Sequence, residues 1–115
     1  MGICHFNRGE YFAAHEAWEA AWKQNKTGPD AEFFKGLAQL GAGYVHLLRG
    51  NAHGAAALLE RAGSRLTNYP DEHLGIHCRD VCERCLSDSA AVTAGILLPG
   101  PEALSGLPPG SYPAV

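Results

Sequence analysis

Apolar residues recur at helical spacing through most of the chain, and the first such stretch is the best defined. Within residues 6–22, the positions Tyr11, His15, Trp18 and Trp22 follow one another at intervals of four, three and four. At 3.6 residues per turn these side chains share one stripe of a helix. We therefore predict a single amphipathic helix in this stretch, with a histidine inside its aromatic stripe.

The start of this first helix carries a capping pattern. Asn7 is a favourable N-cap residue, because its side-chain oxygen can accept a hydrogen bond from a free N–H of the first turn. Glu10 follows three residues later, as in a capping box, and Phe6 and Tyr11 are spaced as a hydrophobic staple. The pattern predicts that the helix begins directly after Asn7.

Three further helical patterns follow along the chain. The second predicted helix covers about residues 30–49 and ends at Gly50, a residue suited to terminate a helix. Asn51 can cap a third helix over residues 52–68, and so short a link predicts an antiparallel pair. A fourth helix is predicted over residues 76–87 from its apolar positions.

Two glycines interrupt the second predicted helix on one side. Gly36 and Gly43 are seven residues apart, and each destabilises a helix by roughly 1 kcal/mol relative to alanine. Close approach of another helix would compensate. We predict that the first helix lies over these glycines.

The last part of the chain differs in composition. Residues 95–115 contain five prolines and four glycines, with Glu102 as the only charged side chain. This composition is typical of extended chain. We therefore predict an all-α fold, with a small bundle of three to four antiparallel helices in residues 1–88. Residues 89–115 are predicted to form an extended C-terminal tail that is either packed on the bundle or disordered.

Composition narrows the classes of function. A chain of 115 residues with a net charge of −3 and scattered basic residues lacks the basic surface of a nucleic-acid-binding protein. No window approaches the roughly 18 apolar residues of a membrane span, and the first residues lack the apolar region of a signal peptide. We expect a single-domain cytoplasmic protein in which the four cysteines are reduced.

The first helix carries candidate chemistry at His15, Glu16 and Glu19. A histidine and a glutamate four residues apart can share a metal ion, although HExxH zinc motifs have a second histidine at the position of Glu19. His46 from the second helix would complete a candidate metal set of His15, Glu19 and His46. The favoured interpretation is a buried polar network in which His15 hydrogen-bonds Glu19 or Gln39.

A second set of polar residues lies on the second helix and the turn after it. Gln39, His46 and Asn51 could face the first helix, where His15 and Trp22 lie. Two helices would then present polar groups to one space. The pattern predicts a ligand-binding cleft there, with core or surface placement of each residue as the alternative.

Three cysteines recur on the fourth predicted helix. Cys78, Cys82 and Cys85 have the spacing of an iron–sulfur cluster loop, but such a loop must wrap around its cluster. Here they fall at i, i+4 and i+7 of a helix. We interpret them as small buried apolar residues, and a metal site is the alternative.

The order of these patterns resembles a known family. The relevant stretches are FNRGEYFAAHEAWEAAW, FFKGLAQLGAGYVHLLRGN and GAAALLERA, within about residues 6–69. They are similar to the domain-of-unknown-function three-hundred-and-nine family of small all-helical bacterial and archaeal proteins. The resemblance implies an all-α bundle core and leaves the activity undefined. It singles out His15, Glu16, Glu19, Trp22, Gly36, Leu37, Gln39, His46, Gly50 and Asn51.

Two hypotheses about function follow. The favoured one is a binding or scaffold module that recognises another protein or a small molecule, or that self-associates into a homo-oligomer. The alternative is a metal-dependent or acid–base enzyme, resembling a hydrolase, with a divalent metal ion as cofactor. In that case Glu16 or Glu19 would be the general base, and His15 and His46 would be ligands or proton shuttles.

Overall fold

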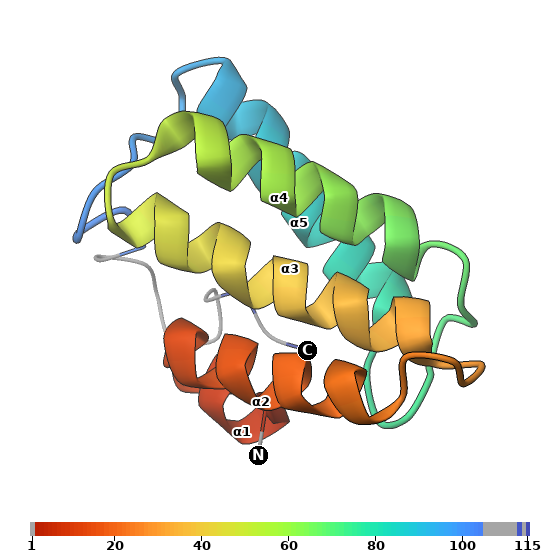
Figure 1. Cartoon of the computed structure of the whole chain (residues 1–115). Helices are drawn as coiled ribbons and strands as arrows, with labels where there is room; N and C mark the ends of the chain where they lie inside the picture. Colours follow the sequence, from red (N-terminus) through yellow and green to blue (C-terminus); the bar gives the residue numbers. More distant parts are fainter. Residues whose placement is uncertain (1, 105–112, 114) are drawn as a thin grey trace.

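The computed structural model describes residues 2–104, 113 and 115. Within these residues the chain forms five α-helices and no β-strand (Figure 1). The all-α prediction is confirmed. None of the described helices has the length and apolar character needed to cross a membrane. The helices are α1 (Gly2–Asn7), α2 (Tyr11–Gln24), α3 (Ala31–Leu48), α4 (Ala52–Leu66) and α5 (Cys78–Thr93).

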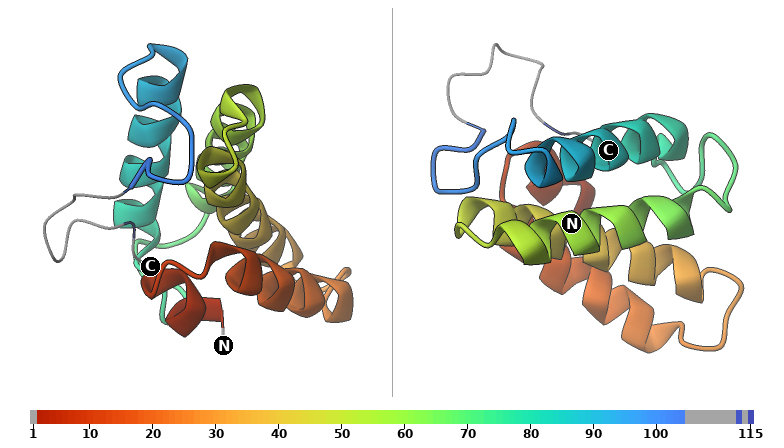
Figure 2. Two further views of the ribbon diagram at one scale, coloured as in Figure 1. Left: turned by 90° about the vertical axis from the view of Figure 1, so that its left-hand side faces the viewer. Right: turned by 90° about the horizontal axis from the view of Figure 1, so that it is seen from above.

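Each helix packs mainly on its neighbours in the chain, and from α2 to α5 successive helices run in opposite directions (Figures 1 and 2). Helices α2, α3 and α4 lie side by side and form one face of the molecule, with α3 in the middle. Helix α5 packs on α4 behind this face, and α1 packs on α2. This order makes α3 the helix around which the others are arranged.

The predicted helix is present as α2 and carries Tyr11, His15, Trp18 and Trp22, but its predicted start directly after Asn7 is wrong. The chain turns at Gly9, where φ is +79°, a value that glycine adopts without strain. Asn7 is therefore the last residue of α1 and caps nothing; its side-chain oxygen accepts a hydrogen bond from the backbone N–H of Val115 (2.9 Å). Phe6 and Tyr11 do contact each other, with ring centroids 5.0 Å apart, but across the turn between two helices.

The prediction that α2 lies over Gly36 and Gly43 is also wrong. Both glycines face α4, since a Cβ atom on Gly43 would lie 2.7 Å from Cδ2 of Leu59. The glycine that faces α2 is Gly41, where a Cβ atom would lie 3.0 Å from the Cα atom of His15. Gly41 is two residues from Gly43 and therefore points to nearly the opposite side of α3.

An aromatic cluster fills the space between α1, α2 and α3. The Phe6 ring lies at its centre, with centroid distances of 5.0 Å to Tyr11, 5.6 Å to Trp18 and 5.7 Å to Tyr44. All four side chains are buried, and burial of one such ring contributes roughly 1.5–3 kcal/mol. The short helix α1 thus covers one side of α2 and leaves the other side, next to α4, open.

Helix α5 is longer than predicted, because residues 88–93 continue it. Asp88 and Ser89 are residue types that often end helices, yet both are buried here with partners on other helices. The Ser89 hydroxyl, for example, donates to the carbonyl of Ala56 on α4 (2.7 Å). After α5, the chain returns to the bundle at Gly100, whose N–H donates to the carbonyl of Leu47 (2.8 Å). Residues 105–112 and 114 of the predicted tail lie outside the described residues.

Candidate functional site

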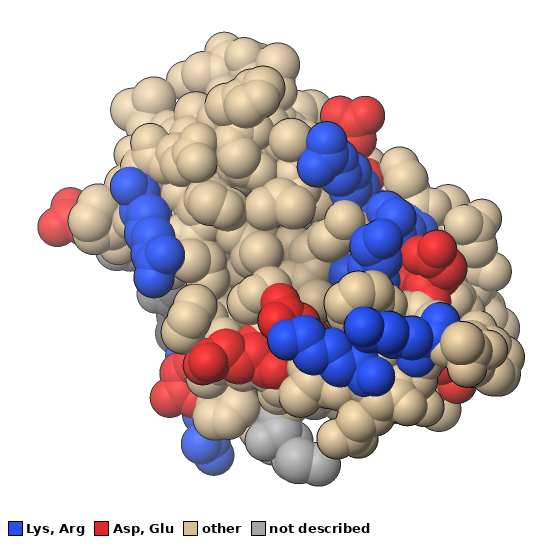
Figure 3. Space-filling view, in the orientation of Figure 1, with Lys and Arg blue, Asp and Glu red and all other residues tan. Residues whose placement is uncertain are grey.

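A cleft with a volume of about 200 Å³ lies where α2, α3 and α4 meet. Its apolar part comes from two alanines of α3 and a leucine of α4, and polar or aromatic side chains surround them. In Figure 3, charged side chains gather on the lower and right-hand parts of this face, and its upper part is almost free of them. The lining residues are His15, Glu19, Trp22, Lys35, Ala38, Gln39, Ala42 and Leu58.

The His15 ring is held by the backbone of α3. Its Nδ1 atom lies 2.8 Å from the carbonyl oxygen of Ala38, and its Nε2 atom lies 3.3 Å from a carboxylate oxygen of Glu19. A carbonyl oxygen can only accept, so Nδ1 carries a proton. The neutral ring therefore presents Nε2 as an acceptor, and the protonated ring donates from Nε2 to Glu19.

Glu19 lies between Lys23 and His15 on α2. The Lys23 ammonium is 3.0 Å from its second carboxylate oxygen. The hydrogen bond from Lys23, followed by the positive charges of Lys23 and His15, lowers the pKa of Glu19 below its ordinary value. A glutamate with a lowered pKa is a weak general base at neutral pH, whereas catalysis favours a raised one.

Gln39 forms the rim of the cleft towards α4. Its side-chain oxygen accepts a hydrogen bond from Nη1 of Arg65 (3.3 Å), whose Nε atom donates to Glu32 (2.9 Å). Of the two predicted partners of His15, Glu19 is in contact with the ring, whereas a bond to Gln39 is absent from the described contacts, because Nδ1 bonds to the backbone of Ala38. The side-chain nitrogen of Gln39 remains as a donor at the cleft.

His46 and Asn51 lie together, but at the turn between α3 and α4. The side-chain nitrogen of Asn51 lies 3.2 Å from Nδ1 of His46, which is therefore the acceptor. The side-chain oxygen of Asn51 accepts from the N–H of Gly54 (2.9 Å), which confirms the predicted cap of α4. Neither residue lines the cleft, and Glu16 is exposed on α2 outside it.

The candidate metal set does not converge in the described part of the chain. No group of three or more His, Cys, Asp or Glu side chains there is placed to hold a metal ion. His15 and Glu19 are adjacent, but His46 is not grouped with them. Burial raises the pKa of Cys85 to about 12, and its thiol faces the carbonyl of Cys82. The structure thus places Cys85 in the core as a protonated thiol.

One polar cluster was not predicted at all. The hydroxyl of Tyr44 on α3 donates to a carboxylate oxygen of Asp88 on α5 (2.5 Å), and Nε of Arg84 donates to the same oxygen (2.9 Å). Burial, followed by the negative charge of Asp88, raises the pKa of Tyr44 well above its ordinary value. Tyr44 and Asp88 are far apart in sequence, so no local spacing could have revealed the pair.

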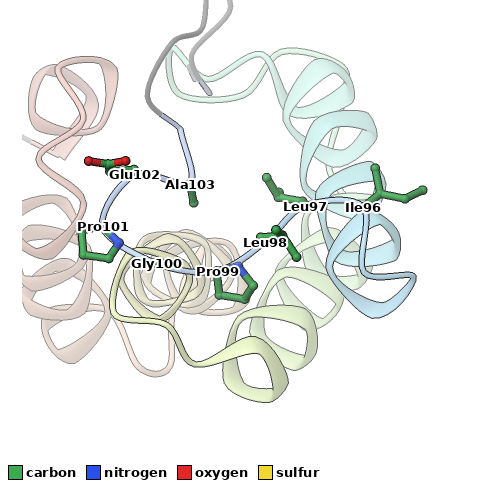
Figure 4. A pocket seen from close by; sticks show the side chains of 8 residues that line it. All are labelled: Ile96, Leu97, Leu98, Pro99, Gly100, Pro101, Glu102 and Ala103. Carbon is green, nitrogen blue, oxygen red and sulfur yellow. The ribbon is translucent and has the colours of Figure 1, made fainter.

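Figure 4 shows a larger hollow, with a volume of about 620 Å³, in the loop after α5. Its lining is the continuous segment 96–103, in which Glu102 is the only titratable side chain. No second element contributes a polar group to it. The cleft between α2, α3 and α4 is therefore the better candidate site.

A comparison with protein families matches the part of the chain that forms this cleft. A family model described as Domain of unknown function (DUF309) matches residues 1–58, half of the chain. The chain belongs to the DUF309 family. The matched DUF309 segment contains all of the residues that line the cleft, and it ends before Arg65 and α5. No curated protein and no solved structure matches the chain.

Sequence patterns found only part of this site. The cleft brings together His15, Glu19, Trp22 and Gln39, as predicted, and excludes Glu16, His46 and Asn51. Lys35 shares the helical stripe of Gln39, which is a signal that the spacing contains. Leu58 was not predicted to line a cleft, because its place next to the buried Leu59 fits a core position equally well.

Proposed function

We propose that this DUF309 chain is a protein-binding module, and that its cleft receives one apolar side chain of a partner protein. The observation that carries the proposal is the convergence of His15, Glu19, Trp22 and Gln39 around an apolar floor. Polar groups at the edge of an apolar pocket are typical of sites that orient a ligand. These four residues come from two helices, α2 and α3, which approach closely at Gly41, where a Cβ atom would lie 3.0 Å from the Cα atom of His15.

The size of the cleft favours a protein partner over a free small molecule. Its volume of about 200 Å³ is below the roughly 300–1,000 Å³ of typical small-molecule sites. It fits one large side chain, and protein interfaces often concentrate their binding energy in such an anchor. Trp22 supplies an aromatic wall, and the Gln39 amide supplies a donor for the partner's backbone.

We further propose that the module acts in the cytoplasm. All four cysteines are free thiols, three of them buried, which fits a reducing compartment. Measuring the number of reactive thiols in protein from fresh lysate tests this point, and oxidised cysteines would contradict it.

The test is a peptide selection on the purified protein, followed by blocking of the cleft. Peptides of 12 residues selected from a random display library should bind the wild-type chain and lose at least tenfold in affinity to Ala42→Leu. Ala42 is half-buried in the cleft, so leucine there occupies the space of the partner's side chain. Ala90→Leu is the matched control, because Ala90 is exposed on α5 and does not line the cleft.

Thermal melting of both variants verifies that they fold. If Ala42→Leu is unstable, Trp22→Ala serves as a second variant that disrupts the cleft. Selected peptides that bind the wild type and both cleft variants equally well would overturn the proposal. So would a selection that yields no specific peptide.

A further inference from the structure

The end of the cleft at Trp22 is rich in lysine. The ammonium group of Lys26 lies 5.3 Å from the centroid of the Trp22 ring, and that of Lys35 lies 5.8 Å from it. Lys35 and Trp22 both line the cleft, and Lys26 lies in the loop after α2. Two positive charges therefore rest on one aromatic side chain at the mouth of the site.

These two lysines differ from their cationic neighbours. Lys23 pairs with Glu19 at 3.0 Å, and Arg65 pairs with Glu32 at 2.9 Å. In the described part of the chain, no carboxylate lies within ion-pair distance of Lys26 or Lys35. The charges within each of these ion pairs cancel, so Lys26 and Lys35 give this end of the cleft a local positive charge, on a chain whose net charge is −3.

We infer that the partner segment carries a carboxylate beside its apolar anchor, and that Lys26 and Lys35 receive this carboxylate at the Trp22 end of the cleft. The inference rests on the proposed function and specifies its partner: a peptide segment with Asp or Glu within about two positions of a large apolar residue. The carboxylate supplies the ion-pair partner that these lysines lack within the described residues, and the apolar side chain occupies the floor of Ala38, Ala42 and Leu58.

An acidic peptide fits this surface better than a nucleic acid does. Proteins that bind single strands use several stacking aromatics along a basic groove. Here one half-buried ring and two lysines with no carboxylate partner among the described residues form a short site, and Glu19 lines the same cleft. Such a site matches one or two carboxylates next to an apolar side chain.

The experiment uses the peptides selected above. Peptides whose binding is lost in Ala42→Leu should be enriched in Asp or Glu near their apolar residue. In the best binder, replacing that acidic residue by Gln should weaken binding two- to tenfold at low salt, and replacing it by Lys should weaken it further. Raising NaCl from 50 to 500 mM should remove most of the difference between the acidic peptide and its Gln version.

Matched variants locate the carboxylate. The double variant Lys26→Ala/Lys35→Ala should bind the acidic peptide as weakly as the wild type binds the Gln version, and Lys26→Arg/Lys35→Arg should retain the preference. Arg8→Ala/Arg79→Ala is the control, because it removes two positive charges outside the cleft lining.

The outcomes separate this inference from the proposed function. Selected peptides that Ala42→Leu disrupts, but that show no acidic preference, would overturn the inference and leave the binding module standing. A preference that survives the double alanine variant would also overturn it, since the carboxylate would then bind elsewhere. Peptides unaffected by Ala42→Leu would overturn both. Tighter, Ala42-dependent binding of an eight-nucleotide single strand would replace the peptide by a nucleic acid.

Discussion

Two polar clusters join the helices of this protein, and they differ in how far water reaches them. At the first, Tyr44 and Arg84 converge on Asp88; Tyr44 is fully buried and the Asp88 side chain is 12% exposed, whereas Arg84 reaches the surface with 34% of its side chain exposed. At the second, the side chain of His15 is 25% exposed and that of Glu19 is 41% exposed. The Tyr44–Asp88 pair of the first cluster is closed within the core, and the second cluster forms the rim of a cleft.

The difference separates structural polar groups from those available to a partner. A buried polar group must find its hydrogen bonds inside the protein, so the Asp88 cluster holds α3 against α5. A half-exposed group can exchange water for a ligand at little loss. Tyr44 and Ala42 are two residues apart and point to nearly opposite sides of α3, so one helix carries both kinds of cluster.

The largest expected effect tests the closed cluster. Asp88→Ala leaves the buried Tyr44 hydroxyl without its acceptor and should lower the free energy of unfolding by about 3 kcal/mol in urea denaturation. Glu83→Ala is the control on the same helix; its exposed ion pair with Arg79 should contribute less than about 0.5 kcal/mol. A loss below about 1 kcal/mol for Asp88→Ala would mean that the cluster does not lock the bundle.

The next effect is the loss of folding stability at alkaline pH, which arises from buried groups of the core. Burial raises the pKa of Cys85 from 9.0 to about 12 and raises that of Tyr44 well above 10.0. A raised pKa stabilises the folded protein below the unfolded value, and this contribution is lost as pH rises towards the folded value. Cys85 alone should therefore make stability fall by about 1.4 kcal/mol per pH unit between pH 9 and 12.

Equilibrium unfolding at pH 7, 9, 10 and 11 measures this slope. Cys85→Ala should flatten it even if the variant is less stable at pH 7, because the titrating group is gone. His15→Ala, in the open cluster, should keep the wild-type slope. An unchanged slope in Cys85→Ala would contradict the burial argument.

The smallest effect is expected in the open cluster. His15→Ala removes one hydrogen bond to the Ala38 carbonyl, and water can replace it, so the expected loss is about 1 kcal/mol. The same variant should weaken binding of the selected peptides, because the ring lines the cleft. A loss of stability as large as that of Asp88→Ala would show that both clusters are structural and would erase the distinction between them.

Local patterns predicted the fold where the interactions themselves are local. The Asn51 cap was found because its acceptor and donor lie three residues apart. The same reasoning failed at Asn7, since Gly9 permits a turn that ends α1 there. The end of α5 was placed too early because burial of Asp88 depends on Tyr44 of α3, 44 residues away, and the sequence does not display that contact.

The candidate site was predictable to a similar extent. Helical spacing placed His15, Glu19 and Trp22 on one helix and Gln39 among the polar positions of the next, and the resemblance to a family singled out the same residues. Glu19, one of the two predicted partners of His15, lies beside its ring. The bonds of His15 to the Ala38 carbonyl and of Gln39 to Arg65 were missed, because they join residues more than 20 positions apart. Only the packing of α3 between α2 and α4 decides which of them face the cleft.

The backbone contact at Gly41 has a consequence for how the cleft binds. A Cβ atom on Gly41 would lie only 3.0 Å from the Cα atom of His15, so α2 and α3 are already closely packed at this point. The cleft is therefore preorganised, and the ordering entropy of complex formation falls on the partner segment. Among related partner segments, we expect residence time to vary more than the rate of association.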